Sequence, residues 1–465
     1  MKRILLLTLL SLLWTAEVAP AAPVAIKADD QKDVMVTIYN GNLGLVKDTR
    51  EARFEAGVTE VKFMDVAAQI DPTSVHLKSL TDPPGLKIVE QNYEYDLLTS
   101  EKLMEKYVGK KVRLYQGNAA YQEAVLLSTN GPVWEINGQI HMGSFGNVVL
   151  PALPENLVSQ PTLVWLISNA RPAPQRIEAS YLTGGITWKA DYVMVINAAD
   201  TRGDLTGWVT IDNKSGGSYK NAAVKLVAGD INRAPLRDAR KAVAVLAAPA
   251  AEATREFKSE GFFEYHLYTL DGRTTIKDKQ TKQLSLLSAP DVPVDKHFIY
   301  YGAAEYYRTS YGVPMSNQKV GVYLEIKNSK DSRLGMPLPK GKVRVYKADA
   351  SGSQQLVGED AIDHTPADER VRLKIGDAFD VVGERAQKDW KKIASSLYEV
   401  EWEISLRNHK KEDLTVEVVE PVPGDWEVLR STVPPEKVDA FTMRFRVPVK
   451  RDSESKLVYR VRVRF

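Results

Sequence analysis

Along much of the chain, apolar and polar side chains alternate with the period of two that is typical of β-strands. The stretch from Thr183 to Asn197 shows this pattern until its second face turns apolar at Val193 and Val195. One face carries Trp188, Ala190, Tyr192, Met194 and Ile196, and the other begins with Lys189 and Asp191. We therefore expect a strand in which Trp188 and Tyr192 belong to the core rather than to a ligand site.

Shorter stretches with the same period fill the N-terminal part of the chain. Asn40 and Gly41 separate two apolar runs and predict a hairpin, because both residues tolerate a positive φ. Short strands continue to Tyr95, which gives an N-terminal β domain over residues 32–95. Helical spacing over Leu97–Tyr107, followed by short strands and tight turns, predicts a short helix and a small barrel-like β module over residues 96–160.

Three similar segments, in each of which a strand runs into an asparagine and a polar turn, indicate repeated β units. Their asparagines are Asn213, Asn328 and Asn408, and asparagine suits a strand exit because it accepts left-handed backbone. Trp208 and Trp402 precede two of them and are assigned to the core. Their spacing fits several β-sandwich-like, immunoglobulin-like modules.

These units divide the rest of the chain. We expect central β domains over residues 161–396, interrupted by an alanine-rich linker at 239–257, and a C-terminal β-sandwich-like module over 397–465. A brief helical spacing also occurs at Glu384–Ala394 and predicts a second short helix.

The first residues carry a different pattern. Two basic residues precede an apolar run over residues 4–14, and the small residues of 19–21 form a cleavage site. This is the pattern of a secretory signal peptide over residues 1–21, so we expect an exported, periplasmic protein. No later apolar run approaches the roughly 18 residues of a membrane helix, and no transmembrane helix is predicted.

Composition narrows the class of function. The chain has 62 Lys and Arg against 60 Asp and Glu, a net charge of +2, and this balance gives no reason to expect nucleic acid as a partner. It contains no cysteine, which excludes disulfides, thiolate metal sites and cysteine nucleophiles.

Candidate catalytic chemistry is sparse. The 6 histidines form no local pair with the spacing of a zinc site, and the chain lacks nucleophile-elbow, phosphate-loop and dinucleotide-binding motifs. We therefore predict no metal and no cofactor. The densest polar cluster surrounds Asp363 and His364, where a carboxylate next to an imidazole is the composition of a general base. The nearby Pro366 favours a polar connection between strands, so a catalytic role for Asp363 and His364 is the alternative.

Tyrosines are concentrated in the segment HFIYYGAAEYYRTSYG. Tyr301, Tyr306, Tyr307 and Tyr311 each offer a flat apolar ring with a polar tip, which suits a sugar or a protein partner. Ordinary strand packing is the competing interpretation of the same four rings.

Two charged strand faces invite functional interpretations. Glu399, Glu401 and Glu403 share one face of a strand, which is more typical of a solvated edge than of a metal or acid–base site. The final strand alternates apolar residues up to Phe465, as the closing strand of an outer-membrane barrel does. Because earlier strands are short, charged and without aromatic girdles, a solvated arginine face is the preferred interpretation of that strand.

Several segments carry a family resemblance. They are NGNLGLVKDTR, SYLTGGITWKADYVMVI, GWVTIDNKSGGSYKNAAVKL, LGMPLPKGKVRVY and EISLRNHKKEDLTVEVVEPVPGDW. Together they resemble the mucoidy-inhibitor-like family of exported bacterial envelope proteins, over most of the chain after the signal peptide. Tyr219 stands where that pattern has tryptophan. The resemblance implies a β-rich fold and an envelope location, and it implies no catalytic residues.

These observations together predict an exported, mainly β protein without enzymatic activity. It would bind or scaffold envelope proteins or polysaccharide, with peripheral association at the outer membrane. Two alternatives stay open: a hydrolase acting on an envelope polymer, and an integral outer-membrane β-barrel.

Overall fold

The computed structural model describes residues 23–94, 99–115, 120–152, 160–229, 231–232 and 257–465. Within them the chain is mainly β, with five sheets and one α-helix, which confirms the predicted fold class at that level. The predicted signal peptide at 1–21 lies outside the described residues, as does the linker at 239–257 except for Phe257. None of the helices in these ranges is long and apolar enough to cross a membrane.

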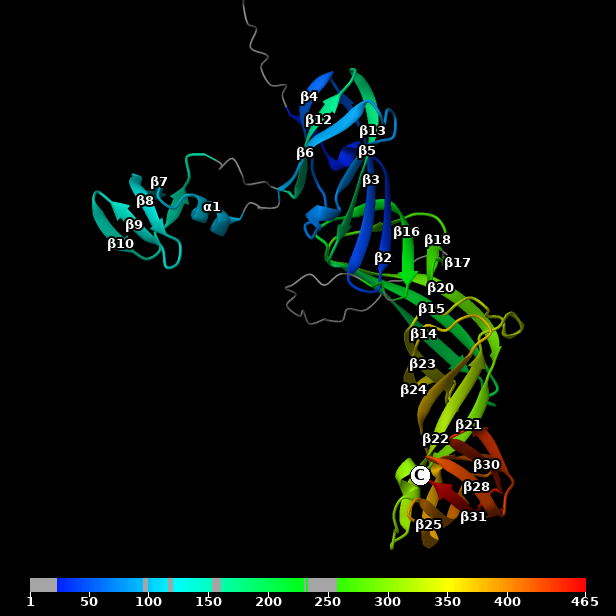
Figure 1. Cartoon of the computed structure of the whole chain (residues 1–465). Helices are drawn as coiled ribbons and strands as arrows, with labels where there is room; N and C mark the ends of the chain where they lie inside the picture. Colours follow the sequence, from blue (N-terminus) through cyan, green and yellow to red (C-terminus); the bar gives the residue numbers. More distant parts are fainter. Residues whose placement is uncertain (1–22, 95–98, 116–119, 153–159, 230, 233–256) are drawn as a thin grey trace, which may run out of the picture.

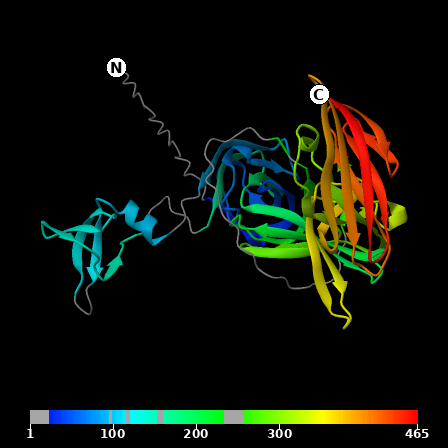
Figure 2. The same cartoon turned by 90° about the horizontal axis from the view of Figure 1, so that it is seen from below.

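Four sheets follow one another along an elongated body, and the fifth forms a small module to one side (Figure 1). The view from below also shows this module apart from the body (Figure 2).

Two sheets form the N-terminal end of the body. The first has the order β1-β4-β12-β6, with β1 Val24–Ile26, β4 Gly57–Phe63, β12 Thr162–Asn169 and β6 Leu86–Glu94. The second has the order β17-β18-β16-β2-β3-β13-β5, and β19 also pairs with β16. Its strands are β17 Phe257–Phe262, β18 Tyr265–Leu270, β16 Tyr219–Ala228, β2 Gln31–Tyr39, β3 Leu43–Phe54, β13 Ala173–Thr183, β5 His76–Ser79 and β19 Thr274–Ile276.

The predicted hairpin at Asn40 and Gly41 is present, because β2 and β3 pair antiparallel across it. The positive φ of this turn is at Asn42, where φ is 53°. Two short 3-10 helices, Ala28–Asp30 and Pro72–Ser74, connect strands in the same region.

The middle of the body is a five-stranded sheet with the order β20-β15-β14-β23-β24. Its strands are β20 Gln280–Pro293, β15 Arg202–Asn213, β14 Ile186–Ile196, β23 Gly341–Ala348 and β24 Gln354–Ile362. β14 contains the alternating face with Trp188 and Tyr192, and it pairs antiparallel with β15 and parallel with β23.

The small module is inserted between β6 and β12. It consists of α1 Ser100–Lys106 and a five-stranded sheet with the order β10-β9-β8-β7-β11. The strands are β7 Lys111–Tyr115, β8 Gln122–Ser128, β9 Val133–Ile136, β10 Gln139–Met142 and β11 Asn147–Val149. The predicted short helix is thus confirmed, and Thr99 caps it by accepting the Lys102 amide at 3.1 Å.

The C-terminal end is a nine-stranded sheet that curls into a nearly closed barrel, with the order β28-β31-β26-β25-β22-β21-β27-β30-β29. Its strands are β21 Asp295–Tyr301, β22 Met315–Lys327, β25 Arg370–Ala394, β26 Leu397–Asn408, β27 Leu414–Pro421, β28 Asp425–Ser431, β29 Pro435–Asp439, β30 Thr442–Val449 and β31 Ser453–Arg464. Two further 3-10 helices, Ala304–Tyr307 and Lys330–Ser332, lie in the connections.

The helix expected at Glu384–Ala394 is wrong, since these residues are the end of β25. There β25 pairs with β26 as far as Ala394 and with β22 at Arg385, and this pairing overrides local helix propensity. The boundary expected between residues 396 and 397 falls between β25 and β26, which are neighbours in this sheet.

Among the described residues, three hydrophobic clusters form the core of these parts. The largest lies among the two N-terminal sheets and the middle sheet and extends to β22 and β25, and it includes Trp188 and Tyr192. The second fills the nine-stranded sheet and includes Trp402. The third belongs to the small module and is centred on Trp134. Trp208, which the sequence assigned to the core, is only partly buried, because it points to the face of β15 opposite Leu205 and Val209.

Candidate functional site

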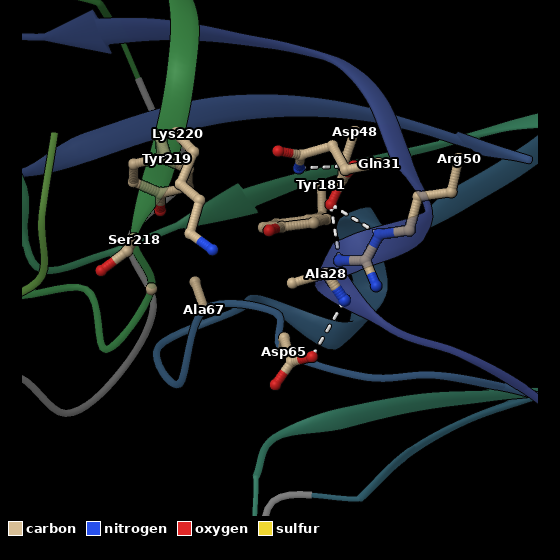
Figure 3. A pocket seen from close by; sticks show the side chains of 11 residues that line it. Ala28, Gln31, Asp48, Arg50, Asp65, Ala67, Tyr181, Ser218, Tyr219 and Lys220 are labelled. Carbon is tan, nitrogen blue, oxygen red and sulfur yellow. Dashed lines mark hydrogen bonds and ion pairs between the residues drawn. The ribbon is translucent and has the colours of Figure 1, made fainter. Parts of the chain in front are cut away.

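A polar hollow lies where β2, β3, β13 and β16 meet the turn that follows β4 (Figure 3). Its lining residues are Ala28, Gln31, Asp48, Arg50, Asp65, Ala67, Tyr181, Gly217, Ser218, Tyr219 and Lys220. The hollow has an empty volume of about 360 Å³ when its open mouth is included. Only about 30 Å³ of this volume is accessible to the centre of a water molecule. Because one water needs roughly 10–15 Å³ on that measure, the hollow suits about two or three waters or a very small polar group.

An ion pair between Arg50 and Asp48 forms one wall. Arg50 Nη2 and Nε donate to Asp48 Oδ2 at 2.7 and 3.1 Å, and the two residues are 1% and 3% exposed. The other carboxylate oxygen, Oδ1, accepts from Gln31 Nε2 at 2.9 Å. A buried charge pair is tolerated only when its remaining valences are also satisfied, and Asp48 meets that condition with side chains alone.

Backbone carbonyls satisfy the rest of Arg50. Its Nη1 donates to the carbonyl oxygen of Ile26 at 3.1 Å and to that of Met64 at 2.7 Å. The guanidinium also lies over the ring of Phe63, 3.8 Å from its centroid. Arg50 therefore ties the first strand and the turn after β4 to β3, which is a structural role.

Two buried tyrosines complete the inner surface. Burial raises the pKa of Tyr181 well above its usual value, and the neighbouring Tyr219 and Asp48 add to this shift. Burial also raises the pKa of Tyr219, whose hydroxyl is 2.9 Å from Ser215 Oγ. Both phenols therefore keep their protons at neutral pH and serve as neutral hydrogen-bonding groups.

The mouth carries the remaining charges. Asp65, in a left-handed conformation with φ 60°, accepts the Ala28 amide through Oδ2 at 3.0 Å. The exposed Lys220 side chain extends across the opening in Figure 3, and it has no partner among the described residues. The hollow thus combines satisfied inner walls with one ammonium group at its entrance.

Sequence reasoning missed this site, although a signal was present. Val46, Asp48 and Arg50 share one face of β3, and all three are buried. Two opposite charges at alternate positions on an apolar strand face predict a buried ion pair.

A second buried ion pair, Arg385–Glu420, lies inside the nine-stranded sheet. Both side chains are 0% exposed, and Arg385 Nη2 donates to Glu420 Oε1. Glu420 Oε2 accepts from the Tyr307 hydroxyl at 2.9 Å, and that hydroxyl is 3.1 Å from the hydroxyl of Tyr459. Because a helix was predicted at 384–394, the sequence analysis did not predict that Arg385 points into the core.

Aromatic rings surround this second guanidinium. Its central carbon lies 4.8 Å from the ring centroid of Tyr306, 5.1 Å from that of Trp402 and 5.5 Å from that of Tyr300. Burial disfavours the charged form, but Glu420 and the nearby phenols hold the pKa of Arg385 well above its usual value. Nε and Nη1 of Arg385 have no hydrogen-bond partner of good geometry among the described residues.

The four tyrosines proposed for partner binding differ in their burial. Tyr307 is 0% exposed, so the prediction of an accessible Tyr307 is wrong. Tyr306 and Tyr311 are partly buried and pack on Trp402, with ring centroids 5.6 and 5.8 Å away. Tyr301 alone is substantially accessible, at 50% exposure. Tyr301 lies at the end of a strand, whereas Tyr306 and Tyr307 lie in a 3-10 helix. Their rings therefore do not point in one direction.

Asp363 and His364 lie in the connection between β24 and β25. His364 Nδ1 accepts the backbone amide of Lys340 at 3.1 Å, and Asp363 is exposed. No group of three or more histidine, aspartate or glutamate side chains within the described ranges is arranged to hold a metal ion.

The carboxylates of Glu399, Glu401 and Glu403 are paired with cations of neighbouring strands. Arg462 donates to Glu399 at 2.8 Å, and Arg460 donates to Glu401 at 2.8 Å. Lys388 reaches Glu403 at 3.2 Å. Two of the C-terminal arginines are thus held by carboxylates on the outer face of the sheet.

Comparison of the sequence with protein-family models and with curated proteins found no match. The resemblance to mucoidy-inhibitor-like envelope proteins therefore stays a prediction.

Proposed function

We propose that this chain is an exported, non-enzymatic binding or scaffolding protein of the bacterial envelope, and that the small module of residues 99–152 is its recognition element. The observation that carries the proposal is the way in which this module is attached. It is inserted between β6 and β12, and these two strands are antiparallel neighbours in one sheet, with Glu94 opposite Thr162.

The module is flanked by two neighbouring strand ends of the body, Glu94 and Thr162. Paired residues in a sheet have Cα atoms about 5 Å apart, so the module leaves and re-enters the body at one point. It has its own sheet and its own hydrophobic cluster. Binding functions commonly reside on elements that a rigid scaffold presents in this way.

The side chains exposed on the module support a role in contact with other molecules. Met142 and Ile140, both on the edge strand β10, are 85% and 62% exposed. Tyr121 is 45% exposed and carries the Arg113 guanidinium 4.8 Å from its ring centroid. Exposed apolar side chains, tyrosine and arginine are typical of protein interfaces and also suit sugar rings.

The finer fold assignment belongs to the same proposal. We infer that the sheets of the elongated body are sandwich-like modules, since one hydrophobic cluster is shared by the two N-terminal sheets and the middle sheet. An envelope location rests on the predicted signal peptide, and peripheral association with the outer membrane is part of the proposal.

The charged outer face of the nine-stranded sheet favours this function over a membrane-inserted one. Arg460, Arg462 and Glu399 form ion pairs there, with side chains 18%, 43% and 15% exposed. A wall that faces lipid carries apolar side chains instead.

The test is a variant that joins Glu94 to Thr162 through a two-residue Asn-Gly turn and so removes the module. We expect its unfolding midpoint to stay within a few degrees of the wild-type value, because the β6–β12 pair is preserved. Its retention on immobilised envelope polysaccharide should fall at least tenfold.

A matched control replaces only the module's exposed residues Ile140 and Met142 with serine. Intermediate loss of binding supports the module as the recognition element. Undiminished binding by the module-free variant would refute the proposal, and shortened polysaccharide chains would favour the hydrolase alternative.

A further inference from the structure

The β17–β18 hairpin forms an exposed tip at the edge of the second sheet. β17 is the last strand in the order of that sheet (Figure 1), so no described strand pairs with its outer edge. The residues of the tip, Glu260 to Glu264, are all exposed. Phe262 is 58% exposed and Phe263 is 87% exposed.

Phe263 occupies a backbone conformation that disfavours its side chain. Its φ is +55°, in a two-residue turn position where glycine or asparagine is the normal choice. For a bulky residue such a φ is an outlier that the rest of the structure must sustain. The ring contacts Tyr265, with centroids 6.2 Å apart, and remains open to solvent. Neither backbone preference nor burial explains a phenylalanine at this position.

The charges around the tip indicate what it contacts. Glu260 and Glu264 flank the two phenylalanines, and neither carboxylate has an ion-pair partner among the described residues. Two carboxylates beside inserted rings are unfavourable at a lipid surface, because they would lose hydration or face anionic headgroups. Opposite a protein they are complementary to a cationic rim around an apolar pocket, which is the usual anatomy of an aromatic anchor site.

We propose that the β17–β18 tip is a docking site for an envelope protein, which receives Phe262 and Phe263 in an apolar pocket bordered by lysine or arginine. This extends the proposed binding role to a second surface and rests on that role. The surface is separate from the small module, so variants of the hairpin and of the module fail independently.

Phe263→Gly separates docking from folding. Glycine adopts a positive φ without strain, so we expect the unfolding midpoint of the full-length variant to equal or exceed that of the wild type. Docking should nevertheless fall, because an anchor ring is gone. A lower midpoint would show that Phe263 serves the fold, and it would overturn the proposal.

Docking is measured in cells with a photo-crosslinking amino acid at position 262 of the full-length chain. The matched control carries the same probe at Phe379, which is 95% exposed on β25. We expect a discrete protein adduct at position 262 with at least tenfold the yield at position 379. Phe263→Gly, and separately Glu260→Lys with Glu264→Lys, should each reduce that adduct at least tenfold.

The captured protein should cross-link through a segment that contains apolar residues next to lysine or arginine. Equal yields at the two positions, adducts with lipid alone, or an adduct that the charge reversal leaves unchanged would each overturn the proposal. An adduct within the chain itself, to its own residues 233–256, would do the same. Binding of the module-free variant at this tip should be undiminished.

Discussion

Two regions of the chain bury an arginine against a carboxylate, and they satisfy the guanidinium in different ways. Arg50 donates to Asp48 and to two backbone carbonyls, beside a hollow that water can reach. Arg385 donates to Glu420 and is otherwise enclosed by aromatic rings. The first arginine connects separate segments of backbone, whereas the second is a charge placed inside an apolar core.

The difference concerns what happens when one partner is lost. Near Asp48, water and the carbonyls of Ile26 and Met64 remain available to Arg50. Near Glu420, the surroundings are side chains that have almost no exposure, among them Tyr307, Tyr459 and Trp402. Replacing the carboxylate by an amide should therefore cost a different amount of unfolding free energy in each region.

The largest effect is expected for Glu420→Gln. This change keeps the shape and leaves the Arg385 charge without a buried counter-ion, which costs about 3–5 kcal/mol of unfolding free energy. Urea unfolding at neutral pH measures the loss. The double variant Arg385→Met with Glu420→Gln should be more stable than Glu420→Gln alone, because it removes the unpaired charge. A double variant that is less stable than the single one would contradict this view of the pair.

Asp48→Asn makes the same change in the other region and should cost less, about 1–3 kcal/mol. Arg50 retains its two carbonyl acceptors, and the asparagine oxygen can still accept from it. Urea unfolding under the same conditions gives a direct comparison with Glu420→Gln. Equal losses of unfolding free energy for the two variants would mean that water in the hollow and the backbone carbonyls do not stabilise an Arg50 without its counter-ion.

The sequence predicts the framework of both regions better than it predicts the pairs. Alternation placed Trp188 and Tyr192 correctly on one face of β14, because that signal is local and repeats every two residues. Arg385 and Glu420 are 35 positions apart and meet through β25 and β27, which are not neighbours in the sheet. Such a contact depends on the curl of the whole sheet, and no spacing in the sequence encodes it.

The lining of the hollow is likewise only partly predictable from local sequence patterns. Asp48 and Arg50 are two residues apart, so their pairing was within reach of pattern analysis. Tyr181 and Lys220 join them from β13 and β16, and β16 reaches this sheet by a parallel pairing with β2. Local patterns identify strands, but they do not identify which strands become neighbours.

Alkaline pH acts on the buried phenols of both regions. Burial raises the pKa of Tyr300 to about 12, with Arg385 opposing the shift, whereas burial raises the pKa of Tyr181 well above its usual value. The unfolded chain releases these protons near pH 10, while the folded protein keeps them. Stability is therefore complete below about pH 10 and falls as pH rises toward 12, by up to about 1.4 kcal/mol per pH unit for each such tyrosine.

Tyr300→Phe removes one of these groups. We expect the decline in unfolding free energy between about pH 10 and 12 to become shallower by one group's contribution. Urea titrations at several pH values measure the slope. An unchanged slope would show that Tyr300 ionises alike in the folded and unfolded chains.

The smallest effect is expected for an ion pair outside both cores. Hydrogen bonds from Arg462 and then the charges of Arg462 and Arg460 lower the pKa of Glu399, which lies on the outer face of the nine-stranded sheet. A depressed pKa gives stability that is present above the unfolded value near pH 4.3 and is lost as pH falls through the folded value. Because its partner Arg462 is 43% exposed on this outer face, Glu399→Gln should cost less than about 1 kcal/mol at neutral pH. Raising the salt concentration to about 1 M should shrink that loss, since the screening length at this concentration is about 3 Å.

The loss of unfolding free energy from Glu420→Gln should persist in the same salt, because the surroundings of Glu420 exclude ions. If both losses responded equally to salt, the buried pair would have to be accessible to solvent, and the contrast between an enclosed and an open guanidinium would fail.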